Sequence, residues 1–301
     1  MAAVSMESVL ANCKDTTSVT IYCMVAPNTE GYEQIEKIVK SHKAGADLVW
    51  CEVKEEDNPF QNYEFSRWSP VIFYRCIAHR FFKDIDKILY LDSDILVYRD
   101  ISELFDTDIK DYVLAGVRDM APVNEKYHPQ GKYVREFAEK YLNNGPYINS
   151  GVLLINLRGM AKYENMLFET KIPLFYPDQD LLNATFFGKI KFLPLKYNLA
   201  PGIPVPKFFP LNEAREAMLG GHVIIHCYSV KPFDKEHAPK PLYDMFSWHA
   251  KNIGMDPEMF MELDKQYTMQ RIKDTFIPGI KIQGTNVIVF NHDGKEIKIK
   301  I

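Results

Sequence analysis

The sequence of 301 residues has few cysteines, no large excess of either charge and no long apolar run. Its five cysteines form no Cys-x-x-Cys pair, which argues against a disulfide framework or a structural zinc site and indicates a reducing, cytoplasmic location. The formal net charge of −4 argues against a general nucleic-acid-binding protein. No stretch approaches the roughly 18 apolar residues of a membrane helix, so we expect no transmembrane segment and, from the N-terminal residues, no signal peptide.

What the chain does contain is an alternation of apolar runs with segments at helical spacing, which is typical of a soluble globular protein with an α/β fold. We expect strands at residues 19–26, 48–53, 87–91, 112–117, 147–157, 190–193 and 223–226. We expect helices at residues 33–43, 69–82 and 178–187. This pattern predicts a mostly parallel central sheet flanked by helices.

The end of the chain has a different character, because residues 280–301 alternate apolar and polar positions between turn residues. Such a pattern predicts a small antiparallel β-meander, whose expected role is to cover a sheet edge or a dimer surface. We therefore divide the chain into a flexible leader at 1–17, a main domain at 18–266 and a helix/β-meander appendage at 267–301.

Two aspartates, Asp92 and Asp94, follow the apolar run at 88–91. Carboxylates this close repel each other unless they share a proton or a cation, and a hard divalent metal that carries a phosphorylated ligand is the usual remedy. An isolated Asp-x-Asp is also typical of a helix cap or a turn. Ligands of open α/β sheets lie outside the carboxyl ends of the strands, so we group the polar residues that we place there. They are Asn28, Asp92, Asp94, Asn149 and His226.

Four further features each allow a structural or a functional interpretation. His226 is either a satisfied core histidine or a third ligand beside the carboxylates, and such mixed ligation suits Mn²⁺. Lys231 is a solvated loop residue or the cation that a departing phosphate needs. Asp178 and Gln179 either belong to a capped helix start or hold the hydroxyls of a sugar. Arg75, on an otherwise apolar helix, reaches solvent or an anion.

Taken together, these residues resemble glycosyltransferase family 8, retaining enzymes that include bacterial lipopolysaccharide galactosyl- and glucosyltransferases and glycogenin. The matching segments occur in the family's order at 73–75, 87–97, 147–157, 177–183 and 226–233. The resemblance implies a GT-A fold, with a Rossmann-like nucleotide-binding half and an acceptor half. It also implies a hexosyltransferase that moves glucose or galactose from a UDP-sugar to a glycan or glycoprotein hydroxyl, with an α-linkage as product.

The resemblance assigns roles to individual positions. The residues that would bind Mn²⁺, or Mg²⁺ in its place, are Asp92, Asp94 and His226. The residues that would act on the donor sugar are Arg75, Asn149, Asp178 and Gln179, the last of them near the anomeric carbon. The residues that would hold the uridine and the diphosphate are Val25, Ala26, Asn28, Ser93 and Lys231. Because the Gln179 amide is a weak nucleophile, we expect front-face attack by the acceptor hydroxyl.

Three positions depart from the family's pattern. Residues 25–28 lack the acidic residue expected after the first strand, which affects uracil recognition. The interval from His226 to Lys231 is one residue short and lacks its glycine, and Phe233 replaces a customary tryptophan. The basic amphipathic tail of some bacterial relatives is also absent.

Two alternative functions and a homodimeric state fit the same sequence. A self-glucosylating primer like glycogenin would need an accessible tyrosine acceptor, and the chain has 17 tyrosines. A sugar-nucleotide-binding protein without transferase activity would explain the altered interval after His226. For the acceptor, residues 118–133 and 197–211 either line its site or form packed surface loops.

Overall fold

The computed structural model describes residues 1–14, 19–42, 45–61, 69–120, 131–275, 281–283, 286–290 and 296–300. The chain divides into two compact units, residues 1–230 and 231–301. The second unit therefore begins before the domain boundary that the sequence suggests at 266/267. Of the predicted loop at 118–133, residues 121–130 lie outside the described part of the chain.

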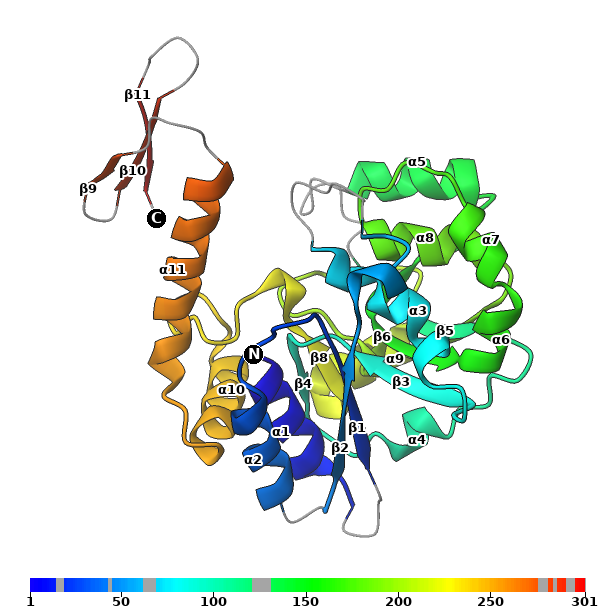
Figure 1. Ribbon diagram of the computed structural model, residues 1–301, viewed down its shortest axis with the longest axis horizontal. Helices are drawn as coiled ribbons and strands as arrows, with labels where there is room; N and C mark the ends of the chain where they lie inside the picture. Colours follow the sequence, from blue (N-terminus) through cyan, green and yellow to red (C-terminus); the bar gives the residue numbers. More distant parts are fainter. Residues whose placement is uncertain are drawn as a thin grey trace. The chain divides into compact units, whose positions relative to one another are not determined.

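The first unit combines strands and helices (Figure 1). Its strands are β1 (Thr20–Val25), β2 (Asp47–Glu52), β3 (Lys87–Leu91), β4 (Ile95–Val97), β5 (Leu114–Arg118), β6 (Ile148–Asn156), β7 (Ile190–Leu193) and β8 (Ile224–His226). Its α-helices are α1 (Ala2–Asn12), α2 (Tyr32–Ser41), α3 (Tyr74–Phe81), α4 (Ser102–Phe105), α5 (Gly131–Tyr141), α6 (Leu157–Lys162), α7 (Glu164–Glu169), α8 (Pro177–Thr185) and α9 (Leu211–Glu216). Its short 3₁₀ or π segments are η1 (Glu55–Asp57), η2 (Pro70–Phe73), η4 (Leu195–Tyr197), η5 (Ala217–Gly221) and η6 (Cys227–Ser229). The strands and helices that the sequence predicts for this unit are confirmed.

The strands pair as β1–β2, β3–β6–β5–β7 and β4–β8 among the described residues. The pairs β1–β2 and β5–β7 are parallel, whereas β6 is antiparallel to both of its neighbours, β3 and β5. The α/β fold is confirmed, with a mixed sheet where a mostly parallel one was expected. The reason is that β6 lies between β3 and β5 and runs in the opposite direction to both, although a helix precedes it as in a parallel arrangement.

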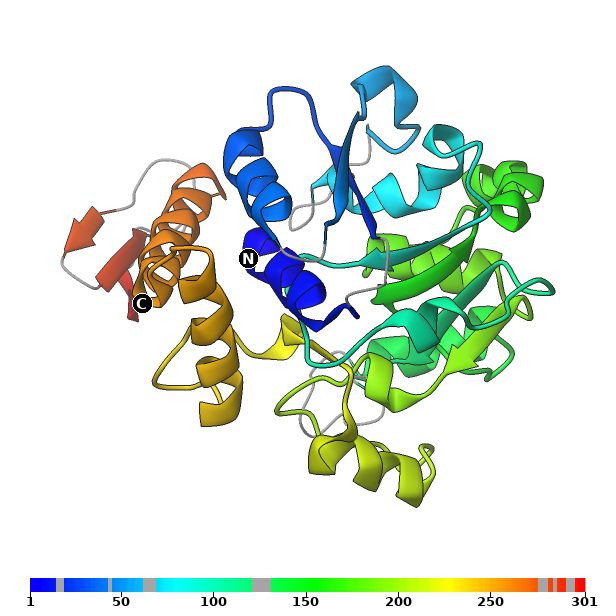
Figure 2. The ribbon, with the colours of Figure 1, turned by 90° about the horizontal axis from the view of Figure 1, so that it is seen from below.

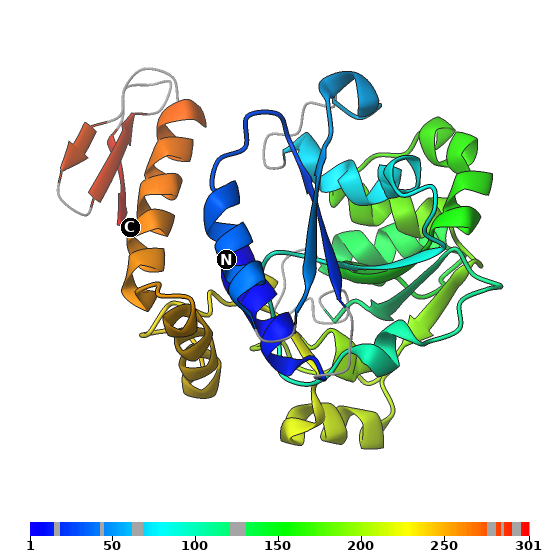
Figure 3. The ribbon, with the colours of Figure 1, turned by 60° about the horizontal axis from the view of Figure 1, so that its bottom comes forward.

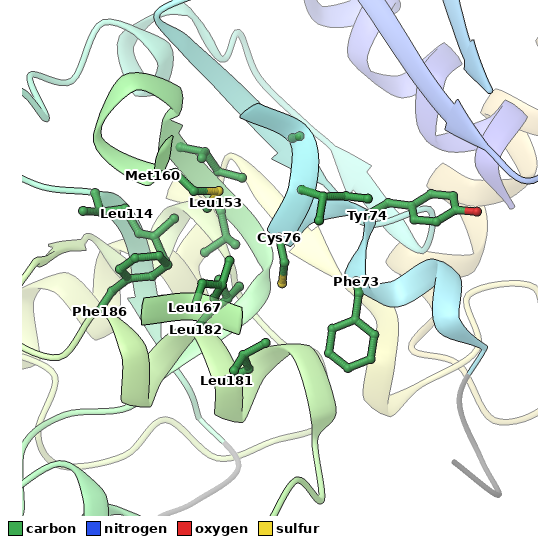
Figure 4. Packing of buried hydrophobic residues seen from close by; sticks show 14 of the residues in the cluster. Phe73, Tyr74, Cys76, Leu114, Leu153, Met160, Leu167, Leu181, Leu182 and Phe186 are labelled. Atoms are coloured by element: carbon green, nitrogen blue, oxygen red, sulfur yellow. The ribbon is translucent and has the colours of Figure 1, made fainter. Parts of the chain in front are cut away.

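The core lies on both faces of this sheet. Along β6, Leu153 and Ile155 join a cluster covered by α3, α6 and α8, which Figure 4 shows around Phe73 and Phe186. The alternate residues Val152 and Leu154 join a second cluster that includes β4, α4 and η4. Successive side chains of a strand point to opposite faces, so a strand covered on both sides is apolar throughout. This explains the near-continuous apolar run that predicts β6.

The expected flexible leader is wrong for residues 2–12, which form helix α1. Figures 2 and 3 show α1 beside α2, and α1 also packs on β4. The Ser5 hydroxyl lies 2.6 Å from the carbonyl oxygen of Ser93 and 2.8 Å from that of Ile95. Apolar burial along α1, with Leu10 fully buried, outweighs the weak helical signal of its sequence. Residues 15–17 of the expected leader lie outside the described chain.

The second unit contains α10 (Lys240–Asn252), α11 (Pro257–Thr275) and the strands β9 (Lys281–Gln283), β10 (Asn286–Phe290) and β11 (Glu296–Lys300). The strands form an antiparallel sheet in the order β11–β10–β9, which confirms the predicted meander. Phe233 packs there against the rings of Phe246 and Phe260. All five cysteines of the chain are free. No helix in the described ranges is both long and apolar enough to cross a membrane.

Candidate functional site

Asp92, Asp94 and His226 converge at one edge of the strands in the first unit. Asp92 follows β3, Asp94 precedes β4, and His226 ends β8, where it pairs with the first residue of β4. One ligand atom from each side chain lies within 4.8 Å of the others. The His226 Nε2 atom is 3.1 Å from Asp94 Oδ1 and 3.6 Å from Asp92 Oδ2. The structure therefore brings together three residues that are up to 134 positions apart in the sequence.

The charges of this cluster depend on one another. Burial disfavours the protonated form of His226, but the hydrogen bond and charge of Asp94 outweigh it and raise the pKa of the imidazole. Burial also disfavours the charged form of Asp94, and its bond to His226 nevertheless lowers the pKa of that carboxyl. The side chains of Asp92 and Asp94 remain 25% and 39% exposed. The cluster thus attracts a positive charge and is open to a ligand.

Asn149 reaches the same place for a reason that the sequence does not show. It is the second residue of β6, not a residue at the strand's carboxyl end. Because β6 is antiparallel to β3, its beginning lies beside the end of β3, and the Asp92 amide donates to the Gly151 carbonyl at 2.8 Å. Asn149 Oδ1 lies 3.2 Å from His226 Nδ1.

Gly151 is required by close packing between the cluster and β6. A Cβ atom at this position would lie 2.0 Å from Cε1 of His226, 2.6 Å from its Nδ1 and 2.8 Å from Oδ2 of Asp92. Real Cβ contacts are never so short, so any larger residue would displace the histidine or the carboxylate. The strand backbone therefore forms one wall of the site.

Arg75 links the cluster to helix α8. The Ser69 hydroxyl and Pro70 begin the η2–α3 segment that carries it, as the sequence predicts. Its guanidinium lies 2.8 Å from Asp92 Oδ1 and 3.3 Å from Asp178 Oδ2. Burial opposes the charge of Arg75, but the Asp178 and Asp92 carboxylates raise its pKa above the ordinary value. Arg75 therefore reaches anions and does not extend to solvent.

Asp178 and Gln179, near the start of α8, are held by Ser150 of β6. The Ser150 hydroxyl donates to Asp178 at 2.8 Å, and the Ser150 amide donates to Gln179 Oε1 at 2.8 Å. Gln179 Nε2 donates to Asp119 Oδ2 at 2.9 Å, so its amide is fixed at both ends. Burial raises the pKa of Asp178 despite the nearby Arg75 guanidinium. Both side chains are buried beside the cluster.

The residues assigned to the nucleotide come from three separate segments of the chain. Val25 ends β1, Ala26 follows it, and Asn28 has left-handed backbone with φ of 61°. Ser93 is exposed, and its carbonyl meets Ser5 as described above. Lys231 belongs to the second unit, where its ammonium group pairs with Asp264 of α11.

Four residues of the site escape the sequence reasoning. Asp119 lies just after β5, so the rule that selects polar residues at strand ends would have found it. Ser150 adjoins Asn149, and Tyr90 lies in β3, where its hydroxyl donates to Asp92 Oδ1 at 2.6 Å. Asn198 follows η4, and nothing in its sequence context indicates that it contacts His226.

Comparison with known proteins identifies this arrangement. The model of glycosyl transferase family 8 matches residues 1–229. The chain belongs to glycosyltransferase family 8. A lipopolysaccharide 1,2-glucosyltransferase of Escherichia coli is 36% identical over 143 residues, which are 44% of this chain and 39% of that protein. A putative glycosyltransferase of Haemophilus influenzae is 30% identical over 214 residues, 66% of this chain and 59% of that protein. The matches thus span from about two fifths to three fifths of these relatives' lengths.

Solved glycosyltransferase structures share the fold. A galactosyltransferase, LgtC, crystallised with donor and acceptor sugar analogues, superposes with a TM-score of 0.65 at 22% identity. The match covers 87% of this chain and 94% of that one. The bifunctional glycosyltransferase WbbM gives a TM-score of 0.62 at 22% identity, over 90% of this chain and 49% of that one. The predicted GT-A fold is confirmed.

Proposed function

We propose that this family 8 glycosyltransferase moves glucose or galactose from a UDP-sugar to a hydroxyl of a glycan or glycoprotein, with retention and an α-linkage. The observation that carries the proposal is the convergence of two carboxylates and one imidazole nitrogen within 4.8 Å. We place the reaction in a reducing, cytoplasmic compartment, and the five free thiols support that location.

The donor set of Asp92, Asp94 and His226 fits a divalent cation of the Mn²⁺ type. Carboxylate oxygens suit hard cations, and an imidazole nitrogen shifts the preference from Ca²⁺ towards Mn²⁺, with Mg²⁺ as the alternative. The two carboxylates repel each other, and a bound cation removes that repulsion. When bound, such an ion supplies Lewis-acid stabilisation of a departing diphosphate.

The residues around the cluster have separate roles in this proposal. Arg75 is saturated by Asp92, Asp178 and the carbonyl oxygen of Ser150, at 2.7 Å in the last case, so it holds the carboxylates in place. Gln179 presents an amide dipole whose orientation Asp119 and Ser150 fix. An amide oxygen is a weak base, and it stabilises a cationic anomeric carbon better than it attacks one.

Front-face attack by the acceptor hydroxyl fits this arrangement. The bond between the anomeric carbon and the diphosphate breaks, and the acceptor oxygen bonds to that carbon on the same face. The departing phosphate oxygen takes the hydroxyl proton, and the anomeric configuration is retained. A hexose donor is supported by the names of the relatives, a glucosyltransferase and a galactosyltransferase.

A donor screen tests this function. The purified chain is mixed with Mn²⁺ and single nucleotide sugars, and released nucleotide is measured with and without EDTA. We expect release of UDP from UDP-glucose or UDP-galactose, and loss of release with EDTA. Turnover of a different nucleotide sugar alone would contradict the donor assignment.

Asp92→Asn isolates the metal role within the same screen. We expect turnover to fall about 100-fold or more, because one metal ligand and the partner of Arg75 are weakened together. The matched control is Asp86→Asn. Asp86 immediately precedes the first residue of β3, and its carboxylate pairs with the exposed Arg158 at 2.5 Å. Equal turnover of the two variants would refute the metal assignment.

Mass spectrometry of the protein after incubation with the donor separates transfer from the glycogenin-like alternative. Transfer to an added acceptor leaves the protein mass unchanged. A mass increase in steps of one hexose would support self-glucosylation instead. NMR of the product's anomeric proton tests the α configuration.

A further inference from the structure

The orientation of the polar network behind His226 can be derived from one atom whose role is certain. The backbone nitrogen of Gly151 can only donate, and it lies 3.0 Å from Asn149 Oδ1. The atom of Asn149 at this position is therefore its carbonyl oxygen, and the amide orientation follows.

The next amide in the network is oriented by the first. Asn198 Nδ2 donates to the same Asn149 oxygen at 2.9 Å. Only the amide nitrogen of Asn198 can take that position, so its Oδ1 atom points to His226, 3.1 Å from Nδ1. Asn198 is 3% exposed, so water does not compete for these bonds.

Both neighbours of His226 Nδ1 are therefore acceptors. Asn149 Oδ1 lies at 3.2 Å and Asn198 Oδ1 at 3.1 Å from it. Two acceptors favour a proton on Nδ1. Nε2 faces the Asp94 carboxylate at 3.1 Å and donates its own proton there, so a cation that takes that proton's place would meet the Nε2 lone pair. Nε2 is the nitrogen that faces Asp94 and Asp92.

We propose that Asn198 is a positioning residue that, with Asn149, holds His226 in the Nδ1–H tautomer and so presents the Nε2 lone pair to the cation. The inference rests on the metal role proposed above for His226. Asn198 touches no reacting atom and acts only through the histidine. Mutating the hydrogen-bond partner of the nitrogen that does not bind the metal typically lowers the metal affinity of such a histidine by about 10- to 100-fold.

The backbone keeps Asn198 and His226 in register. The His226 amide donates to the Leu199 carbonyl at 3.0 Å, and the Leu199 amide donates to the Ile224 carbonyl at 3.1 Å. The residue before Leu199 thus lies beside the imidazole of His226 whichever side chain it carries. A substitution at position 198 changes the hydrogen bond without moving the strand.

The first test reads the tautomer in protein saturated with Mg²⁺, which is diamagnetic and so leaves the ring signals observable. Nitrogen-15 NMR is recorded at a pH above the titration of the imidazole, which the same spectra define. We expect the His226 ring to carry its proton on Nδ1, with Nε2 as the bare nitrogen. A ring with its proton on Nε2 and a bare Nδ1 would overturn the inference.

The second test measures the dissociation constant for Mn²⁺ in two variants. Asn198→Leu removes the acceptor, and we expect Mn²⁺ binding to weaken about 10-fold or more. Asn198→Asp keeps an acceptor for Nδ1–H, so we expect affinity within about threefold of the wild type. Equal losses in both variants, or no loss in Asn198→Leu, would overturn the positioning role.

A matched control is Asn12→Leu, which removes a different, partly buried amide contact. Asn12 Nδ2 donates to the carbonyl of Val97 at 3.0 Å and does not touch His226. We expect this variant to bind Mn²⁺ like the wild type. If Asn198→Leu fails to fold, the wild-type tautomer and the affinity of Asn198→Asp decide the question. A wild type that binds neither Mn²⁺ nor Mg²⁺ would refute the proposed metal site itself, whereas binding by a ring with a bare Nδ1 would refute only the positioning role.

Discussion

Aspartates at two places in the first unit have opposite surroundings. Asp180 of α8 has both oxygens occupied by protein donors. Its Oδ1 accepts from the Tyr147 hydroxyl at 2.6 Å. Its Oδ2 accepts from the Tyr133 hydroxyl at 2.7 Å and from the amides of Phe175 and Tyr176 at 2.8 Å each.

Asp92 and Asp94, by contrast, face each other and His226 across a space narrow enough for one ion. Asp92 has Arg75 and Tyr90 on one oxygen, while its other oxygen faces the histidine. A carboxylate that is saturated by protein donors has no capacity left for a ligand, whereas one that is held against a like charge does. The comparison separates a structural acid, Asp180, from acids suited to binding, Asp92 and Asp94, although each belongs to an Asp-x-Asp sequence.

The largest expected effect comes from disturbing the binding group through Gly151→Ala. The added methyl group would displace His226 and Asp92, and a shift of about 1 Å at such a site can cost roughly 100-fold in turnover. Transfer assays and thermal unfolding of the purified variant measure the two consequences separately.

Gly116→Ala is the control for a methyl group added to a central strand. Its Cβ would meet the ends of Ile148 and Leu153 at 2.9 and 3.0 Å, where side chains can adjust. We expect lower stability but nearly unchanged turnover per folded molecule. Similar turnover in the Gly151 and Gly116 variants would mean that the close approach of β6 to the cluster is unimportant.

We expect Asp180→Asn to lower the stability of the protein, whereas Gly151→Ala lowers its turnover. The asparagine offers one acceptor oxygen and places an NH₂ group against tyrosine or backbone donors. Leaving buried donors without an acceptor costs about 1–3 kcal/mol each, so we expect a loss of roughly 2 kcal/mol or more in the free energy of unfolding. Urea denaturation measures it, and the variant should still bind Mn²⁺. Loss of Mn²⁺ binding with intact stability would reverse the roles that we assign to the two groups.

A smaller effect concerns pH. Burial outweighs the four donors and raises the pKa of Asp180 to about 6 from 3.8. The folded state then binds a proton more tightly than the unfolded state, so this group's contribution to stability decreases as pH rises from about 4 to 6. We expect the stability difference between wild type and Asp180→Asn to be roughly 1 kcal/mol larger at pH 5 than at pH 7. A difference independent of pH would show that the carboxyl has an ordinary pKa.

Much of the fold follows from local pattern. The apolar runs locate β1, β3 and β6, and β6 is apolar almost throughout because it is covered on both faces. Ser69-Pro70 marks the start of the Arg75 segment. Helix α1 escapes prediction because its stability comes from packing on β4 and α2, which its own sequence does not show. The antiparallel direction of β6 is not predicted from the sequence for the same reason.

The site shows how a prediction can succeed on an incomplete argument. Grouping Asn149 with Asp92 assumed that both end parallel strands, and the structure brings them together because β6 is antiparallel. Asn198 could not be found, because its contact with His226 depends on the path of the chain between η4 and β8. Ligand-type residues carry a recognisable pattern, whereas the residues that orient them are defined by the tertiary structure.

The central claim is that Asp92, Asp94 and His226 form one cation site. Titration of Mn²⁺ followed by electron paramagnetic resonance tests it most directly, with the wild type, Asp94→Asn and Asp180→Asn compared at equal protein concentration. We predict one saturable site in the wild type and in Asp180→Asn, and affinity reduced about 10-fold or more in Asp94→Asn. Equal Mn²⁺ affinity in the wild type and Asp94→Asn, or no saturable site in the wild type, would contradict the claim.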